Sequence, residues 1–111
     1  MEKNYKIAYV VSDLKRVGPT NQTYNIIENS KYKKNSIVIT LFKEPQDTLK
    51  YKYQNSNIKV ICLNLNRKIW FLGKIKLKRM LKKMNPNIVH SYGIKADYLC
   101  DKCSNEKKWN H

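Results

Sequence analysis

Short apolar runs alternate with longer amphipathic stretches along the whole chain. Four runs rich in β-branched residues predict strands, at residues 5–11, 36–42, 58–63 and 87–90. Helical spacing predicts a helix starting at Thr20 and two more at 68–84 and 94–104, with a short one around 47–53 inside a polar loop. This alternation predicts an α/β fold with a parallel sheet and right-handed crossovers, that is, a Rossmann-like three-layer arrangement.

The expected helix boundaries rest on particular residues. Thr20 can cap the first helix through its hydroxyl, with Ile26 and Ile27 on the buried side. Pro86 ends the helix at 68–84, because proline disfavours the helical conformation in the residue before it. One face of that helix is predicted to be buried, and its residues are Ile69, Trp70, Gly73, Leu77, Met80, Leu81 and Met84.

Size and composition fit one small domain of 111 residues, of which 41% are hydrophobic. No apolar run approaches the ~18 residues of a membrane span, and no secretory signal is recognisable. Cys62, Cys100 and Cys103 make an odd number of cysteines in a chain without a signal, which favours free thiols in a reducing cytoplasm.

Cys100 and Cys103 have C-x-x-C spacing, which is shared by zinc and redox sites. Zinc needs four ligands, and only Cys62 and His111 remain as distant candidates. A thioredoxin-type pair stands at the start of a helix, whereas this pair falls late in the last one. We therefore predict two free thiols, with no metal and no cofactor.

The formal net charge is +15, from 23 basic and 8 acidic residues. Such a potential attracts nucleic acid, anionic lipid or phosphorylated substrates. Lysine, asparagine, isoleucine and tyrosine share AT-rich codons, so a genomic bias is the other explanation of the lysine excess.

Much of the basic charge falls on the predicted helix 68–84, where Phe71, Leu72 and Ile75 also project. A basic face with large apolar side chains suits an anionic membrane surface. The alternative is a solvated face whose lysine stems cover apolar surface. The basic residues away from the apolar stripe are Lys68, Lys74, Lys76, Lys78, Arg79, Lys82 and Lys83.

Ligands of open parallel sheets bind beyond the carboxyl ends of the strands, which directs attention to loops 12–20 and 90–93. In the first loop, Gly18, Pro19 and Thr20 stand at a helix start, where backbone N–H groups and the helix dipole suit a phosphate. Neither G-x-G-x-x-G nor G-x-x-x-x-G-K-[ST] is present. Gly18 could therefore serve only a turn, and Pro19 only the helix start.

The second loop reads His90-Ser91-Tyr92-Gly93. A histidine at the carboxyl end of a strand can act as a general base or donate a hydrogen bond to a phosphate. The alternative is a partly buried structural histidine. Gly93 would let the chain turn into its helix. We expect Gly18 and His90 to lie side by side, because the strands preceding them are predicted to be adjacent and parallel.

Four segments occur in a fixed order: YKIAYVVSDLKRVGPTNQTYNIIE, NSIVITLFKEPQDT, IKVICLNLNRK and MNPNIVHSYGIKADYL. They resemble the N-terminal domain of family 4 glycosyltransferases, and the resemblance extends over about residues 4–101. These are retaining enzymes of the two-domain GT-B type, and the similarity is greatest to bacterial members from polysaccharide and lipopolysaccharide O-antigen clusters.

The resemblance implies roles for both loops. The first loop would approach the diphosphate of the donor through Gly18, Pro19 and Thr20, and His90 would lie near the reacting sugar. Tyr92 and Gly93 would belong to the substrate site. Members usually carry two glycines and a glutamate in the first loop and His-Ser-His-Gly in the second, so this chain lacks one glycine, the glutamate and the second histidine.

The resemblance also implies a longer protein. Family members have a larger N-terminal domain and a C-terminal domain that binds the nucleotide-sugar, so residues 1–111 are expected to be an incomplete acceptor-side domain without the donor domain, inactive alone and with an uncovered sheet edge. The implied partners are a nucleotide-sugar donor, held by the missing domain, and a lipid-linked glycan acceptor. The implied location is cytoplasmic and peripheral, at the inner face of the cell membrane.

Two other classes remain open. A basic, non-enzymatic α/β module that binds nucleic acid would account for the charge, but no nucleic-acid motif is recognisable, so nucleic acid is not the expected partner. A flavodoxin-like or response-regulator-like domain shares the element order. The regulator version is disfavoured because no acidic cluster follows the first strand.

Overall fold

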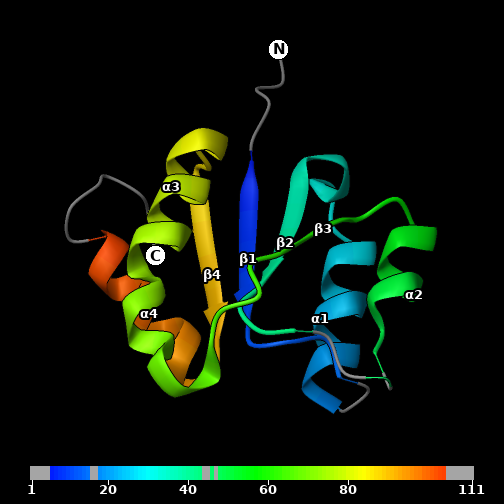
Figure 1. The fold of residues 1–111 in the computed structure, drawn as a ribbon. Helices are drawn as coiled ribbons and strands as arrows, with labels where there is room; N and C mark the ends of the chain where they lie inside the picture. The colour runs from blue at the N-terminus through cyan, green and yellow to red at the C-terminus, as the bar shows by residue number, and fades with distance from the viewer. Residues whose placement is uncertain (1–5, 16–17, 44–45, 47, 105–111) are drawn as a thin grey trace.

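The computed structural model describes residues 6–15, 18–43, 46 and 48–104. Its centre is a four-stranded, all-parallel sheet with the strand order β3-β2-β1-β4 (Figure 1). The strands are β1 (Ile7–Val11), β2 (Ser36–Thr40), β3 (Lys59–Cys62) and β4 (Ile88–Tyr92). The predicted α/β class with a parallel sheet is therefore confirmed.

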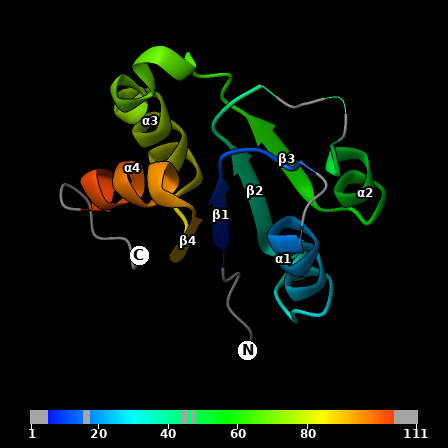
Figure 2. The same cartoon turned by 90° about the horizontal axis from the view of Figure 1, so that it is seen from below.

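Helices lie on both faces of the sheet. Figure 2 shows α1 and α2 on one side and α3 and α4 on the other, which confirms the three-layer arrangement. The α-helices are α1 (Gly18–Glu28), α2 (Lys50–Asn55), α3 (Lys74–Met84) and α4 (Ile94–Ser104), and the 3₁₀ segments are η1 (Lys33–Asn35) and η2 (Arg67–Gly73). No helix in the described ranges has both the length and the apolarity to cross a bilayer.

The sheet divides the buried side chains into two cores, because successive residues of a strand point to opposite faces. Ala8 and Val10 of β1 face the α3–α4 side, and Ile7, Tyr9 and Val11 face the α1–α2 side. All five side chains are buried, as is typical of a parallel strand covered on both faces. The helical residues that complete the cores are Leu77, Leu81 and Leu99 on one side and Ile27 and Tyr53 on the other.

The expectation of one continuous helix over 68–84 is wrong. η2 occupies the first part, Ile69 has non-helical angles (φ −125°, ψ 37°), and α3 begins only at Lys74. Gly73 itself has helical angles (φ −73°, ψ −2°) and packs tightly on Leu65, since a Cβ there would lie 2.3 Å from the Leu65 Cδ1. Asn66 supports the preceding turn by accepting a hydrogen bond of 2.8 Å from the Lys68 N–H.

The predicted buried face of this region is only partly right. Gly73, Leu77 and Met84 are buried, but Ile69 is 47% exposed because it precedes α3 and does not continue its face. α3 ends at Asn85, which has a left-handed conformation (φ 52°) and donates its N–H to the Leu81 carbonyl over 2.8 Å. The helix thus stops at an asparagine cap just before Pro86.

The first helix begins earlier than expected. α1 starts at Gly18, so Thr20 lies within its first turn and is not its N-cap. The Thr20 hydroxyl instead donates to the Lys15 carbonyl of the preceding loop. Ile27 is fully buried but Ile26 is 53% exposed, since neighbouring helical residues point about 100° apart.

Candidate functional site

The loops after β1 and β4 meet at the carboxyl edge of the sheet, as predicted. β1 and β4 are paired in parallel along their full length, and Val11 opposite Tyr92 is the last pair. Just beyond it, a Cβ placed on Gly93 would lie 3.9 Å from the Ser12 Oγ. Because α1 and α4 both begin after these loops, two helix N-termini open on the same edge.

The described part of the first loop is held in place from several sides. Asp13 accepts a hydrogen bond of 3.0 Å from the Lys15 N–H through Oδ1, and its Oδ2 lies 3.3 Å from the Arg67 Nη2 of η2. Leu14 is fully buried, and its carbonyl accepts the Leu49 N–H over 2.7 Å. The loop is therefore attached both to η2 and to the segment that leads into α2.

Thr20 has an internal role. Its side chain is buried, its hydroxyl donates to the Lys15 carbonyl, and its own carbonyl accepts the Tyr53 hydroxyl over 2.6 Å. A ligand at this helix start would therefore meet backbone groups before it met the Thr20 hydroxyl. Gly18 and Pro19 are the first residues of α1, and the surroundings of their side-chain positions lie outside the described residues.

His90 does not lie at the end of its strand. β4 runs from Ile88 to Tyr92, not over 87–90, so His90 is in the middle of β4 and opposite Tyr9 in the register. The two rings are stacked with centroids 5.4 Å apart at an interplanar angle of 21°. Pairing with β1 keeps the chain extended as far as Tyr92, which moves the imidazole from the rim of the sheet to its face.

Tyr92 and Gly93 occupy the rim in place of His90. Tyr92 projects to the same face as His90, since the two are separated by two positions in the strand, and it is 37% exposed. Burial raises the pKa of the Tyr92 hydroxyl, so the phenol is neutral and can donate a hydrogen bond at physiological pH. Gly93 makes the turn into α4 with φ 101°, a conformation that favours glycine.

The β4–α4 junction is also closed by its own polar groups. The Asp97 N–H donates to the Gly93 carbonyl over 2.8 Å, and the Ser91 hydroxyl donates to the Asp97 carboxylate. These bonds fix the turn in which Gly93 lies. In the described part of this junction, the His90 imidazole and the Tyr92 phenol are exposed polar groups on the α1 side of β4.

Sequence reasoning missed two contributors to this region. Tyr9 reads as a core residue within an apolar run, yet its ring supports the imidazole of His90. Burial raises the pKa of the Tyr9 hydroxyl, and the neighbouring Tyr92 raises it further. Asp13 reads as an ordinary loop residue, yet it joins the first loop to η2. Only the strand register and the position of η2 reveal these contacts.

Metal coordination has no visible basis in the described part of the chain, where no three His, Cys, Asp or Glu side chains come together to hold an ion. Cys100 is buried in the core beneath α3 and α4, and Cys62 is half-buried on β3. The side chain of Cys103 lies outside the described residues.

Comparison with known proteins adds no relative: no protein-family model matches the chain, and a search of curated proteins gives no significant match. The structure shows a Rossmann-like α/β fold. The resemblance of four sequence segments to family 4 glycosyltransferases is therefore the basis of a proposal only.

Proposed function

We propose that the chain is the acceptor-side part of a retaining glycosyltransferase that transfers a sugar from a nucleotide-sugar to a lipid-linked surface polysaccharide intermediate. The observation that best supports this is the meeting of the β1 and β4 loops, where Gly93 and Ser12 come together and two helices begin. Such an edge of a parallel sheet is where ligands of open α/β folds bind.

In this proposal the start of α1 stabilises the diphosphate leaving group. Negative charge develops on the diphosphate as the bond to the sugar breaks, and the positive end of a helix dipole favours that charge. Gly18, Pro19 and Thr20 form this helix start. Because the Thr20 hydroxyl already donates to Lys15, Thr20 would contribute through its backbone.

The acceptor sugar would contact the α1-side face of β4. His90 offers an exposed imidazole, and Tyr92 offers a neutral phenol two positions further along the strand. Both groups form hydrogen bonds with hydroxyl groups, which a sugar supplies in number. Gly93 then lets the chain turn away without a side chain over this surface. The nucleotide-sugar itself would be held by a second domain.

An amide chemical-shift titration of the purified chain with a nucleoside diphosphate tests this proposal. Weak binding is expected, with the shift changes concentrated in residues 12–15, 18–20 and 92–95. Sodium sulfate at equal ionic strength is the control for charge alone and should not reproduce that pattern. Shift changes spread over the lysines of α3, with none in the two loops, would contradict the proposed diphosphate site.

A His90→Ala and Tyr92→Phe pair tests the acceptor face separately. Both side chains are partly or largely exposed, so we expect the variants to fold and to keep the nucleoside diphosphate response. In an enzyme carrying the second domain, each variant should lower kcat/KM for the acceptor. Unchanged acceptor kinetics in both variants would remove this face from the proposal.

A nucleic-acid-binding module is the second candidate, and the net charge of +15 favours it. Binding of a fluorescent single-stranded RNA would then fall steeply as the salt concentration rises, because counterions are released on binding. Tight RNA binding together with no response of the two loops to nucleoside diphosphate would favour this candidate over the transferase.

A further inference from the structure

η2 and the first turn of α3 expose several large apolar side chains. Ile69, Phe71, Leu72 and Ile75 are 47%, 51%, 60% and 62% exposed. A single exposed apolar residue is ordinary, but here four fall within seven positions, and Ile69, Leu72 and Ile75 line one cleft. Such a patch indicates a surface that is covered by something other than water.

The same segment forms an open cleft with a volume of about 380 Å³. Apolar side chains make most of its wall, and Lys76 and Arg79 also line it. The cleft lies where η2 and α3 join at Gly73. The residues lining it are Leu65, Asn66, Ile69, Leu72, Gly73, Ile75, Lys76 and Arg79.

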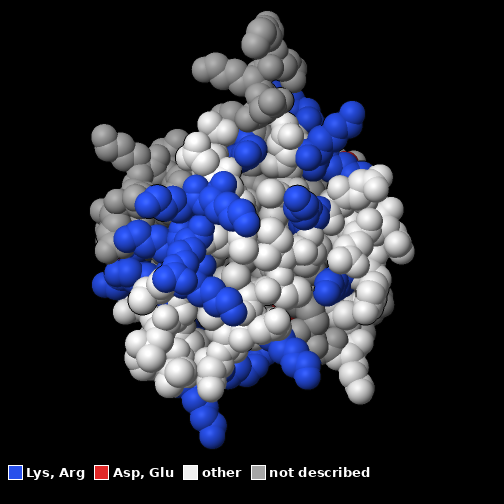
Figure 3. All heavy atoms as spheres, turned by 45° about the horizontal axis from the view of Figure 1, so that its top comes forward, with Lys and Arg blue, Asp and Glu red and all other residues white. Residues whose placement is uncertain are grey.

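The segment that carries these apolar side chains is rich in basic residues and has no acidic one. Residues 67–84 include eight basic residues and no acidic one. On α3, Arg79 lies one turn beyond Ile75 and on the side away from the buried Leu77 and Leu81. Figure 3 shows Lys and Arg side chains gathered in a band on the side of the molecule that α3 occupies in Figure 1.

A purely solvated lysine face does not account for this arrangement. Lysine stems can cover apolar surface, yet the four apolar side chains remain about half exposed with those lysines in place. Large apolar tips among cations suit the membrane interface, where the tips enter the acyl boundary and the cations meet lipid phosphates. The charge complementarity therefore selects an anionic leaflet.

A nucleic-acid surface fits the same residues less well. Single-stranded nucleic acids stack their bases on exposed aromatic rings, and of the four exposed side chains only Phe71 is aromatic, whereas Ile69, Leu72 and Ile75 are aliphatic. The Trp70 ring is already engaged edge-on, with centroids 6.3 Å from the Phe71 ring and 5.5 Å from the Tyr98 ring. The protruding groups thus favour lipid over bases.

We propose that this apolar–basic patch, formed by Ile69, Phe71, Leu72 and Ile75 with Arg79, Lys82 and Lys83, docks the protein on an anionic membrane leaflet. η2 and the first turn of α3 insert, and the remainder of α3 lies along the headgroups. The surface therefore has two parts, which replace the single amphipathic helix expected over 68–84. The proposal rests on this surface alone and does not require the glycosyltransferase activity.

Docking in this way would bring the sheet's carboxyl edge to the lipid. η2 is tied to the first loop through the Arg67–Asp13 ion pair. Arg67 also lies over the Phe42 ring at 4.4 Å from its centroid. A membrane bound through η2 would therefore lie beside the edge at which the two loops meet.

Co-sedimentation with vesicles tests the proposal. Phosphatidylcholine vesicles with and without phosphatidylglycerol are compared, and we expect binding at least about tenfold stronger to the anionic vesicles. Equal or negligible binding to both kinds would overturn the proposal. The nucleoside diphosphate titration contains no lipid, so the two proposals can fail independently.

Matched variants separate the apolar contribution from the charge. Leu72→Ser with Ile75→Ser should reduce binding to anionic vesicles about tenfold, whereas Ile26→Ser with Tyr51→Ser should leave it unchanged. The control pair is similarly exposed, at 53% and 66%, but lies on the α1–α2 side. If both double variants bind as the parent does, charge alone attracts the protein and the insertion is disproved.

Charge variants of equal net charge complete the test. Arg79→Gln, Lys82→Gln and Lys83→Gln together should abolish the preference for anionic vesicles. Neutralising three exposed lysines elsewhere should preserve it, and the control set is Lys31, Lys34 and Lys52, each changed to Gln. An equal loss in both triple variants would show attraction by net charge without a defined surface, which contradicts the proposal.

Trp70 reports insertion directly. In a Trp109→Phe background, Trp70 is the remaining tryptophan, and brominated lipids in anionic vesicles should quench its fluorescence. The Leu72→Ser, Ile75→Ser variant in the same background should be quenched less. Binding without quenching would place η2 away from the acyl boundary and refute the proposed orientation.

Discussion

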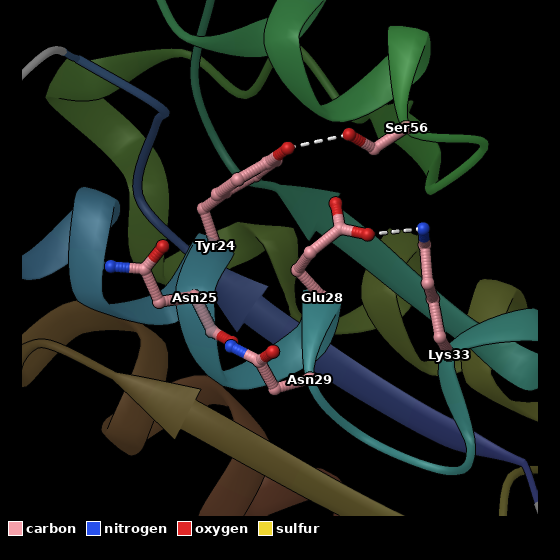
Figure 4. A network of polar contacts seen from close by, with 6 residues as sticks. All are labelled: Tyr24, Asn25, Glu28, Asn29, Lys33 and Ser56. Atoms are coloured by element: carbon pink, nitrogen blue, oxygen red, sulfur yellow. Dashed lines mark hydrogen bonds and ion pairs between the residues drawn. The ribbon is translucent and has the colours of Figure 1, made fainter.

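The two helical layers differ in how they use their polar groups. In the α1–α2 layer these groups bind one another: Tyr24 and Ser56 join their hydroxyls over 2.5 Å, and Glu28 pairs with Lys33 (Figure 4). α3 has six basic residues and no acidic one: Arg79, Lys82 and Lys83 are exposed, whereas the Lys76 ammonium donates to the Leu63 carbonyl. The first layer is thus closed by internal contacts, and the second presents a surface.

The interiors of the two layers do not show this difference, because both are apolar and well buried. Burial therefore accounts for the fold on both sides of the sheet, whereas the outer faces account for what each side can contact. The comparison teaches that the function of this scaffold is to be sought in the exposed groups of its outer faces. Four changes test that view.

Truncation of a buried and of an exposed leucine in the same region should give the largest contrast. Leu81→Ala removes a side chain that is fully buried beneath α3, and we expect a loss of about 2–5 kcal/mol in the free energy of unfolding. Leu72→Ala removes a side chain that is 60% exposed and should change the free energy of unfolding by less than about 0.5 kcal/mol. Urea denaturation measures both, and equal losses would mean that Leu72 is covered.

Removal of one internal hydrogen bond should weaken the α1–α2 layer. Tyr53→Phe deletes the hydroxyl that donates to the Thr20 carbonyl over 2.6 Å in a buried setting. We expect a loss of about 1–3 kcal/mol in the free energy of unfolding, because a buried hydrogen bond between α2 and α1 is removed. Tyr51→Phe, on the exposed side of the same helix, is the control. A Tyr53→Phe protein as stable as the parent would show that this layer does not depend on that bond.

Gly93→Ala should destabilise the turn that joins β4 to α4. The new Cβ has space, with the nearest atom 3.9 Å away, so the cost comes from the backbone at φ 101°. A loss of about 1–2 kcal/mol in the free energy of unfolding is expected. Ile94→Ala, at the neighbouring and 87% exposed position, should cost little. Similar stability of the two variants would argue against strain at Gly93.

The smallest effect should come from Glu28, through pH. Hydrogen bonding to Lys33, and less strongly to Ser56 and Tyr24, lowers the pKa of Glu28 from 4.5 to about 2. The unfolded chain binds this proton at a higher pH than the folded protein, so the stabilisation is present above pH 4.5 and is lost as the pH falls toward 2.

A comparison of the parent with Glu28→Gln isolates this group. The difference in their free energies of unfolding should be small, since the pair is at the surface, and should shrink between pH 4.5 and pH 2. High salt should reduce it at neutral pH. A difference that grows on acidification would have the wrong sign and would exclude the ion pair as its cause.

The strands and the order of the elements could be predicted from the sequence. β-branched runs mark all four strands, and a parallel sheet follows from their alternation with helices. The predicted range 94–104 coincides with α4, because Gly93 marks its start clearly. These features depend on local composition and periodicity, which a single sequence contains.

The register and the helix ends could not be predicted in the same way. His90 was expected at a strand end, but pairing with β1 extends β4 to Tyr92. The break at Ile69 has no local signal, because Ile69 fits the apolar spacing expected of a helix over 68–84. Asn85 ends α3 in a left-handed conformation, a role for which glycine is the usual signal.

The candidate site was foreseen in its location but not in its chemistry. Adjacent parallel strands bring the two loops together, so the edge itself could be predicted. The hydrogen bond from the Thr20 hydroxyl to the Lys15 carbonyl could not be predicted, because it depends on where that carbonyl points. Likewise, stacking on Tyr9 requires the strand register.

The six basic residues of α3, with no acidic residue in the same helix, make the charge distribution of the protein uneven, whether or not anything is bound. At physiological ionic strength its field extends over roughly 8 Å, about the last few water layers before contact. Within that range an anionic surface exerts a torque and turns the protein before the two touch. The protein is therefore already oriented when it first meets the surface. Added salt should lower the association rate constant more than it raises the dissociation rate constant.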